Sequence, residues 1–91
     1  MREYQYPLNL DWTTEEMVLV MNMWDALEQV YETGLPAEKF LQTHQAFKTV
    51  VRSIGEERRL GREFEELSGY SLYRTLQAAK ENPAGKLKMK G

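Results

Sequence analysis

The pattern of apolar and polar residues is most regular between Thr14 and Glu32. Apolar side chains recur there at intervals of three and four residues, the spacing that lines one face of an α-helix. The first such row consists of Met17, Val20, Trp24, Leu27 and Tyr31. A second row beside it consists of Leu19, Met23, Ala26 and Val30. The two rows form an apolar arc wider than a surface helix needs, so we expect this helix to be the centre of the fold.

Residues at both ends of this segment favour a helix of the same length. Thr13 and Glu16 form the pattern of a capping box, in which each side chain bonds a backbone N–H at the helix start. Glu15 and Glu16 also lie at the positive end of the helix dipole. Gly34 can adopt the left-handed conformation that commonly follows a helix end.

The middle of the chain predicts two more helices with narrower apolar stripes. Pro36 suits the first turn of a helix from about Ala37 to Val51, because its missing N–H costs nothing there. A third helix, from about Gly55 to Leu67, follows a second capping pattern at Ser53. The apolar stripes of the two helices are Phe40, Phe47 and Val51, and Leu60, Phe64 and Leu67.

A fourth, shorter helix is expected from about Leu72 to Glu81. Gly69 ends the third helix, Ser71 caps the fourth, and Asn82-Pro83 stops it. The predicted fold is therefore all-α, a small helical bundle of three main helices plus a shorter fourth.

The two ends of the chain lack helical periodicity. Residues 1–12 alternate between apolar and polar, which would suit an edge strand, but Pro7 cannot donate to a sheet ladder. We favour an extended, irregular arm that lays Tyr4, Tyr6 and Trp12 against the helices. Residues 83–91 are expected to be a disordered basic tail. The sequence thus predicts a single helical domain over residues 1–82, with the tail outside it.

Composition limits the classes of function. A chain of 91 residues suits one domain. It contains no cysteine, which excludes a disulfide framework, a thiolate zinc site and a cysteine nucleophile. No secretory signal is visible at the start, and the longest apolar run, Met17 to Met21, is far shorter than the roughly 20 residues of a membrane span. We expect a cytoplasmic protein without a membrane partner.

Charge is unevenly distributed along the chain, which has a net charge of −2. Residues 1–35 are strongly acidic and residues 80–91 are basic, a balance that argues against a general nucleic-acid binder. The second and third predicted helices have the outline of a helix-turn-helix, so a nucleic-acid-associated regulator is an alternative. However, the acids that surround Arg58, Arg59 and Arg62 would repel a duplex.

His44 is the only histidine and the centre of the least favoured alternative, an enzyme. It could act as a general base or metal ligand, but no nucleophile and orienting carboxylate lie nearby in the sequence. It lies between Phe40 and Phe47 on an apolar helix face, which favours a ring that covers the edge of the core. We predict no catalytic residue, no metal ligand, no cofactor and no small-molecule substrate.

Several stretches resemble a known protein family. They are Tyr4-Gln5-Tyr6-Pro7, Asp11-Trp12-Thr13-Thr14-Glu15-Glu16-Met17, Glu63-Phe64-Glu65 and Ser68-Gly69-Tyr70-Ser71, followed by Tyr73 and Arg74. Their order and spacing resemble the YktA-type family of small proteins from Bacillus-like Gram-positive bacteria, an uncharacterised protein family. The resemblance covers nearly the whole chain up to about Lys80. It implies a compact all-helical cytosolic protein of unknown function and supplies no catalytic or binding residues.

The function we expect is a non-enzymatic protein–protein interaction or regulatory module, with another protein or a second copy of the chain as its partner. The oversized apolar arc and the abundance of Tyr, Trp and Met favour this interpretation. Three candidate contacts, Leu19, Met23 and Val30, belong to the second apolar row. Three more lie near the corner before the fourth helix, where Tyr and Arg suit interface anchors: Tyr70, Tyr73 and Arg74. The alternative for this corner is a turn sealed by the tyrosines.

Overall fold

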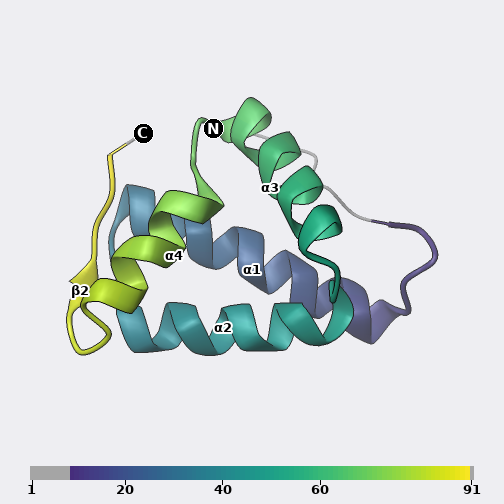
Figure 1. Ribbon diagram of the computed structural model, residues 1–91, viewed down its shortest axis with the longest axis horizontal. Coiled ribbons are helices and arrows are strands. Elements are labelled where there is room, and N and C mark those ends of the chain that lie inside the picture. Colours follow the sequence, from purple (N-terminus) through teal and green to yellow (C-terminus); the bar gives the residue numbers. More distant parts are fainter. Residues whose placement is uncertain (1–8, 91) are drawn as a thin grey trace.

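Four helices and one short strand pair make up residues 9–90, the part of the chain that the computed structural model describes (Figure 1). The helices are α1 (Thr14–Glu32), α2 (Ala37–Val50), α3 (Ile54–Ser68) and α4 (Leu72–Glu81). The strands β1 (Leu35–Pro36) and β2 (Lys86–Leu87) pair antiparallel, with Leu35 opposite Leu87. The predicted all-α class is confirmed. Tyr4 and Tyr6 of the predicted arm lie outside the described residues, while Trp12 packs half-buried against the core.

The ends of α1 follow from its sequence. The Thr13 N–H donates to Glu16 Oε1 (2.9 Å) and the Glu16 N–H donates to Thr13 Oγ1 (3.1 Å), which completes the predicted capping box. At the other end the N–H groups of Thr33 and Gly34 both donate to the Gln29 carbonyl. Gly34 has φ +96°, a conformation that strains other residues, and a Cβ there would lie 2.7 Å from Lys86 Cε.

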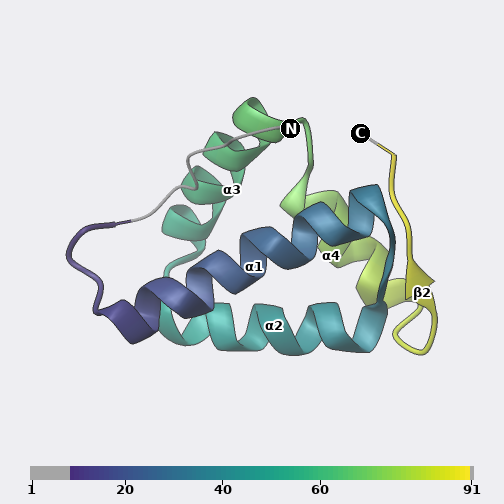
Figure 2. The same ribbon diagram turned by 180° about the vertical axis from the view of Figure 1, so that it is seen from behind.

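Helix α4 is the shortest of the four helices, yet it packs against both α1 and α2. Helices α1 and α2 run antiparallel, side by side, and α4 lies behind the C-terminal half of α1 in Figure 2 and also contacts α2. The shortest helix is therefore central, because Thr75, Leu76 and Ala79 of α4 are buried against the long pair. Helix α3 leans away from this trio and meets α4 where Gly61 lies beside Leu72.

Trp24 of α1 is the centre of the core and has no exposed surface. Its ring stacks on Phe64 of α3, with centroids 4.9 Å apart, and meets Phe47 of α2 edge-on at 5.6 Å. Such aromatic pairs add about 0.5–1.5 kcal/mol each beyond the area they bury. One residue of the first apolar row thus joins three of the four helices. None of the helices within residues 9–90 has the length and apolarity that crossing a membrane requires.

The expectation of a disordered tail is wrong for residues 85–90. Leu87 is buried, and Met89 is half-buried against the core. The Ala37 N–H donates to the Gly85 carbonyl (2.9 Å) and the Met89 N–H donates to the Val30 carbonyl (3.1 Å). The segment alternates lysines with Leu87 and Met89, the period of two of a strand with one side on the core, and a search for helical periodicity overlooks it. The domain therefore extends beyond residue 82.

Candidate interaction surface

Three of the six predicted contact residues are not on the surface. Met23 and Val30 have no exposed area, and Tyr70 is only 7% exposed. Met23 and Val30 belong to the continuous core, in which the C-terminal segment bonds the backbone of Val30. The prediction that these residues contact a partner is therefore wrong, because the chain covers most of the second apolar row itself. Leu19 remains half-buried, while Arg74 is exposed and Tyr73 is 70% exposed.

The corner between α3 and α4 is built as a turn. Gly69 has φ +82°, and its N–H donates to the Glu65 carbonyl (2.7 Å) to end α3. The Tyr70 ring stacks on Tyr31 with centroids 4.4 Å apart, and its hydroxyl donates to Glu32 Oε2 (3.1 Å). The Ser71 N–H donates to the Tyr31 hydroxyl (3.0 Å). Tyr70 therefore seals the corner, and of the three contacts predicted there Tyr73 and Arg74 remain exposed.

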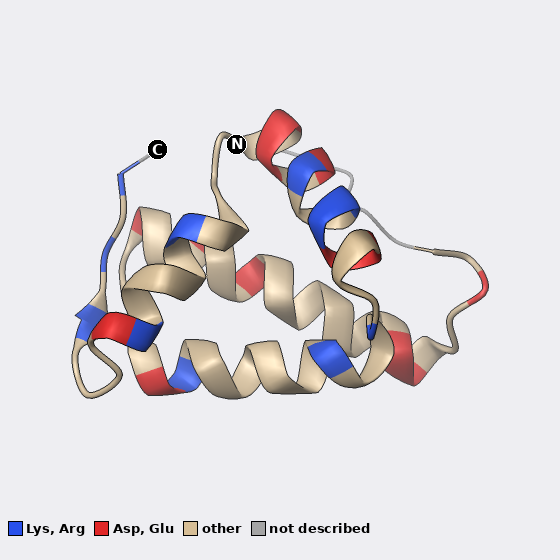
Figure 3. Ribbon diagram, viewed as in Figure 1, with Lys and Arg blue, Asp and Glu red and all other residues tan. Residues whose placement is uncertain are grey.

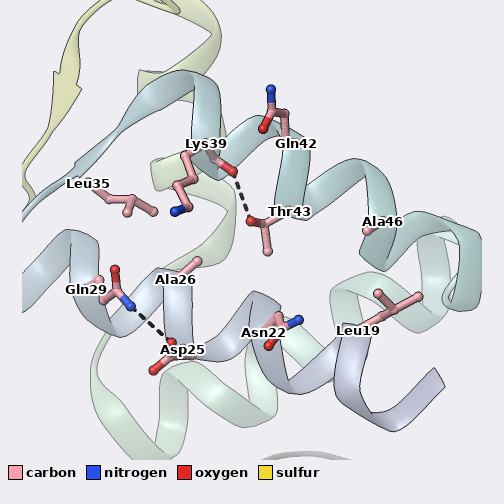
Figure 4. Close-up of a pocket in the computed structure, with 10 residues that line it drawn as sticks. All are labelled: Leu19, Asn22, Asp25, Ala26, Gln29, Leu35, Lys39, Gln42, Thr43 and Ala46. Carbon is pink, nitrogen blue, oxygen red and sulfur yellow. Dashed lines mark hydrogen bonds between the residues drawn. The ribbon is translucent and has the colours of Figure 1, made fainter. Parts of the chain in front are cut away.

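An open groove of about 450 Å³ runs between α1 and α2 on the side away from α4 (Figure 4). Its polar rims are Asn22, Asp25 and Gln29 on α1 and Lys39 and Gln42 on α2, and the Lys39 side chain extends over the groove. The groove exists because the helices face each other there with small side chains, which leave space. The residues between the rims are Leu19, Ala26, Leu35, Thr43 and Ala46.

Exposed apolar side chains continue from this groove onto the outer surface of α1. Val18 is 48% exposed and Met21 is 42% exposed, and both are sequence neighbours of groove residues. The stretch from Met17 to Met23 contains no charged residue. We name the groove-lining residues together with Val18 and Met21 the α1/α2 face. Of the predicted contacts, Leu19 alone belongs to this face. The groove was missed because its residues are mostly polar or small and carry no sequence signal.

His44 has a carboxylate partner that the sequence did not reveal. His44 Nε2 lies 2.8 Å from Glu57 Oε2, and Lys48 Nζ lies 2.7 Å from Glu57 Oε1. Burial raises the pKa of Glu57, but the hydrogen bonds from Lys48 and His44 and their charges outweigh burial and hold this pKa below the ordinary value of a glutamate. His44 and Lys48 are one turn apart on α2, so both can bond Glu57 in the first turn of α3.

Ser53 and Ser71 serve as the helix caps that the sequence predicts. Ser53 Oγ accepts the Glu56 N–H (3.3 Å), and Ser71 Oγ accepts the Arg74 N–H (3.2 Å). The His44 ring lies against Phe47, with centroids 5.9 Å apart, as expected for a histidine at the core edge. Within residues 9–90 there is no group of three or more His, Cys, Asp or Glu residues that could hold a metal ion.

Helix α3, the recognition helix of the helix-turn-helix alternative, has a mixed charge (Figure 3). Arg59 lies between acids of its own helix, 3.7 Å from Glu56 and 3.4 Å from Glu63. Glu57 is engaged by α2 as described above. The α3 surface therefore presents arginines and carboxylates side by side.

The fold and surface define a small all-α protein with an open, amphipathic groove along an antiparallel helix pair. The chain belongs to the family described as "Uncharacterised protein family (UPF0223)", whose profile matches residues 3–88. It is 73% identical over 89 residues to a UPF0223 protein of Enterococcus faecalis, and the aligned residues cover 98% of this chain and 97% of that relative. It is 50% identical over 88 residues to a UPF0223 protein of Streptococcus pneumoniae, and the aligned residues cover 97% of this chain and 96% of that relative. The predicted membership of an uncharacterised family is confirmed, and the function of this family is unknown.

Proposed function

We propose that this protein is a non-enzymatic interaction module that binds a protein partner through the α1/α2 face. The observation that carries the proposal is the groove with its adjoining exposed apolar side chains, Val18 and Met21. Interface cores are depleted of charge and contain apolar residues, with polar residues at the rim. The α1/α2 face has this composition, with Val18, Leu19 and Met21 beside rims that contain Asp25 and Lys39.

We also propose a subgroup of the family and a cellular location for this chain. The Tyr4–Pro7 and Ser68–Arg74 motifs support placing the chain in the YktA-type group of its family. The cysteine-free composition supports a cytoplasmic location. We propose no cofactor, no membrane partner and no small-molecule substrate.

Photo-crosslinking in cells that produce the protein tests the proposed function. A photoreactive amino acid replaces the exposed Gln42, on the groove rim, or the exposed Gln77, on the outside of α4, as a matched control. We expect covalent protein adducts from position 42 and few from position 77. Adding Leu19→Glu, which puts a charge into the groove, is expected to remove the adducts at position 42. Absence of adducts at position 42, or equal adducts at both positions, would contradict the proposed function.

A further inference from the structure

We infer that the protein partner of the α1/α2 face is a second copy of this chain, docked with α1 of each copy over α2 of the other. This inference rests on the proposed function, since it names the occupant of the same face. An arrangement of this kind is a two-fold, isologous interface, in which every contact occurs twice.

Charge complementarity selects this pairing of helices. Helix α1 contains five acids and no lysine or arginine: Glu15, Glu16, Asp25, Glu28 and Glu32. On α2 the groove rim carries Lys39, whereas Lys48 is bound to Glu57 of α3. Laying α1 on α1 would bring like charges together, which costs stability and disfavours that partner orientation. Laying α1 on α2 brings opposite charges together on both sides of the two-fold axis.

The groove rims supply a specific charge pair. Asp25 stands on the α1 rim and Lys39 on the α2 rim (Figure 4). A two-fold axis that runs along the groove, parallel to the helices, places Asp25 of one copy over Lys39 of the other, and the reverse contact forms at the same time. The Asp25 carboxylate accepts a hydrogen bond from the Gln29 amide of its own helix (3.0 Å) and has further lone pairs that can accept a lysine. The flexible four-carbon stem of lysine tolerates small differences in register.

The antiparallel run of α1 and α2 fixes the register of the other contacts. A two-fold rotation about an axis that runs along the groove preserves the direction of α1, so α1 of one copy runs antiparallel to α2 of the other, as the two helices do within one copy (Figures 1 and 2). One helical turn before Asp25, Asn22 of one copy therefore meets the region of Gln42 and Thr43 of the other, one turn beyond Lys39. Polar amides would meet polar side chains there, and the small residues between the rims allow close approach.

The face is large enough for a dimer of two small proteins. At 1.5 Å per residue, a helix as long as α1 extends about 28 Å, and two adjacent helices are roughly 20 Å wide. Protruding side chains add to the flat area of such a face. Its accessible area is therefore comparable to the ~800 Å² per partner that standard interfaces bury. The exposed Val18 and Met21 supply apolar area beside the groove.

Light scattering of purified chains with reversed charges tests the inference. The unmodified protein is expected to show twice its monomer mass of 10.7 kDa at micromolar concentrations. Asp25→Lys and Lys39→Glu are each expected to raise the dimer dissociation constant at least about tenfold, because like charges then face each other twice. The double variant restores opposite charges and is expected to recover most of the loss. Circular dichroism checks that each variant remains helical.

Matched control variants keep the result specific. Glu66→Lys on α3 and Lys80→Glu on α4 make the same changes in net charge at exposed positions away from the groove, and both are expected to leave the dimer intact. A monomer mass at all concentrations, a dimer insensitive to Asp25→Lys, or a double variant without recovery would each overturn the inference. A monomer that still crosslinks a different protein at position 42 would overturn the second-copy inference while leaving the proposed function in place. A monomer without adducts would overturn both.

Discussion

Glu57 shows how one side chain holds two helices together. Its carboxylate accepts hydrogen bonds from His44 and Lys48 of α2 while it lies in the first turn of α3. The same position near the α3 N-terminus favours a negative charge through the helix dipole. Removing one member of a largely buried ion pair leaves the others without compensation, so the cost exceeds that of a surface pair.

Replacing Glu57 with glutamine is expected to reduce the free energy of unfolding by about 1–3 kcal/mol at neutral pH. Because the folded-state pKa of Glu57 is lowered below that of an unfolded-state glutamate, the carboxylate stabilises the fold above the unfolded-state pKa and loses its contribution as pH falls through the lowered pKa. Urea unfolding at pH 7 and at pH 3 measures the effect, with Glu66→Gln as the exposed control. A difference between Glu57→Gln and the unmodified chain that stays constant across this pH range would contradict the account.

The groove residues were not predictable one by one. Asn22, Gln42 and Thr43 look like ordinary solvent-facing positions in the sequence, and they gain a shared role only because α1 and α2 lie side by side. Met23 and Val30 were mistaken for surface residues because periodicity gives the width of an apolar arc but not which neighbours cover it. The His44–Glu57 contact spans 13 residues, so no local motif reveals it.

At the scale of elements, the four helices were predictable because each carries its own start and stop signals. Thr13, Ser53 and Ser71 cap three of the helices, and Gly69 ends α3 in the left-handed conformation. The packing order was not predictable, since the buried residues of α4 look no different from a narrow surface stripe. The C-terminal strand was missed because its pairing partner, Leu35–Pro36, lies about 50 residues away and is itself only two residues long.

Leu87 tests whether β2 belongs to the fold. Leu87→Ala is expected to reduce the free energy of unfolding by about 2 kcal/mol or more, because it removes a buried side chain from the core. The exposed Lys90→Ala is expected to change it by less than about 0.5 kcal/mol. Thermal or urea unfolding measures both variants. Equal effects at the two positions would mean that the segment contributes nothing to the core.

At the scale of the whole molecule, the two sides of the α1–α2 pair differ in what covers them. One side of the α1–α2 pair is covered by α4, and Trp24 joins α1 to α2 and α3. The other side stays open as the α1/α2 face, with Asp25 on the rim of one helix and Lys39 on the rim of the other. A surface with opposite charges on its two halves is complementary to its own two-fold copy, which connects the arrangement of the helices to the proposed dimer.

The most direct test of this account is crosslinking between single cysteines, which the cysteine-free chain makes unambiguous. Asn22→Cys and Gln42→Cys proteins are mixed at equal concentration and treated with a short bismaleimide, with Asn22→Cys plus Gln77→Cys as the control mixture. We expect rapid crosslinks between positions 22 and 42, faster than between positions 22 and 77. Equally slow reaction in both mixtures, or faster reaction at position 77, would contradict the claim that the α1/α2 face joins two copies of the chain.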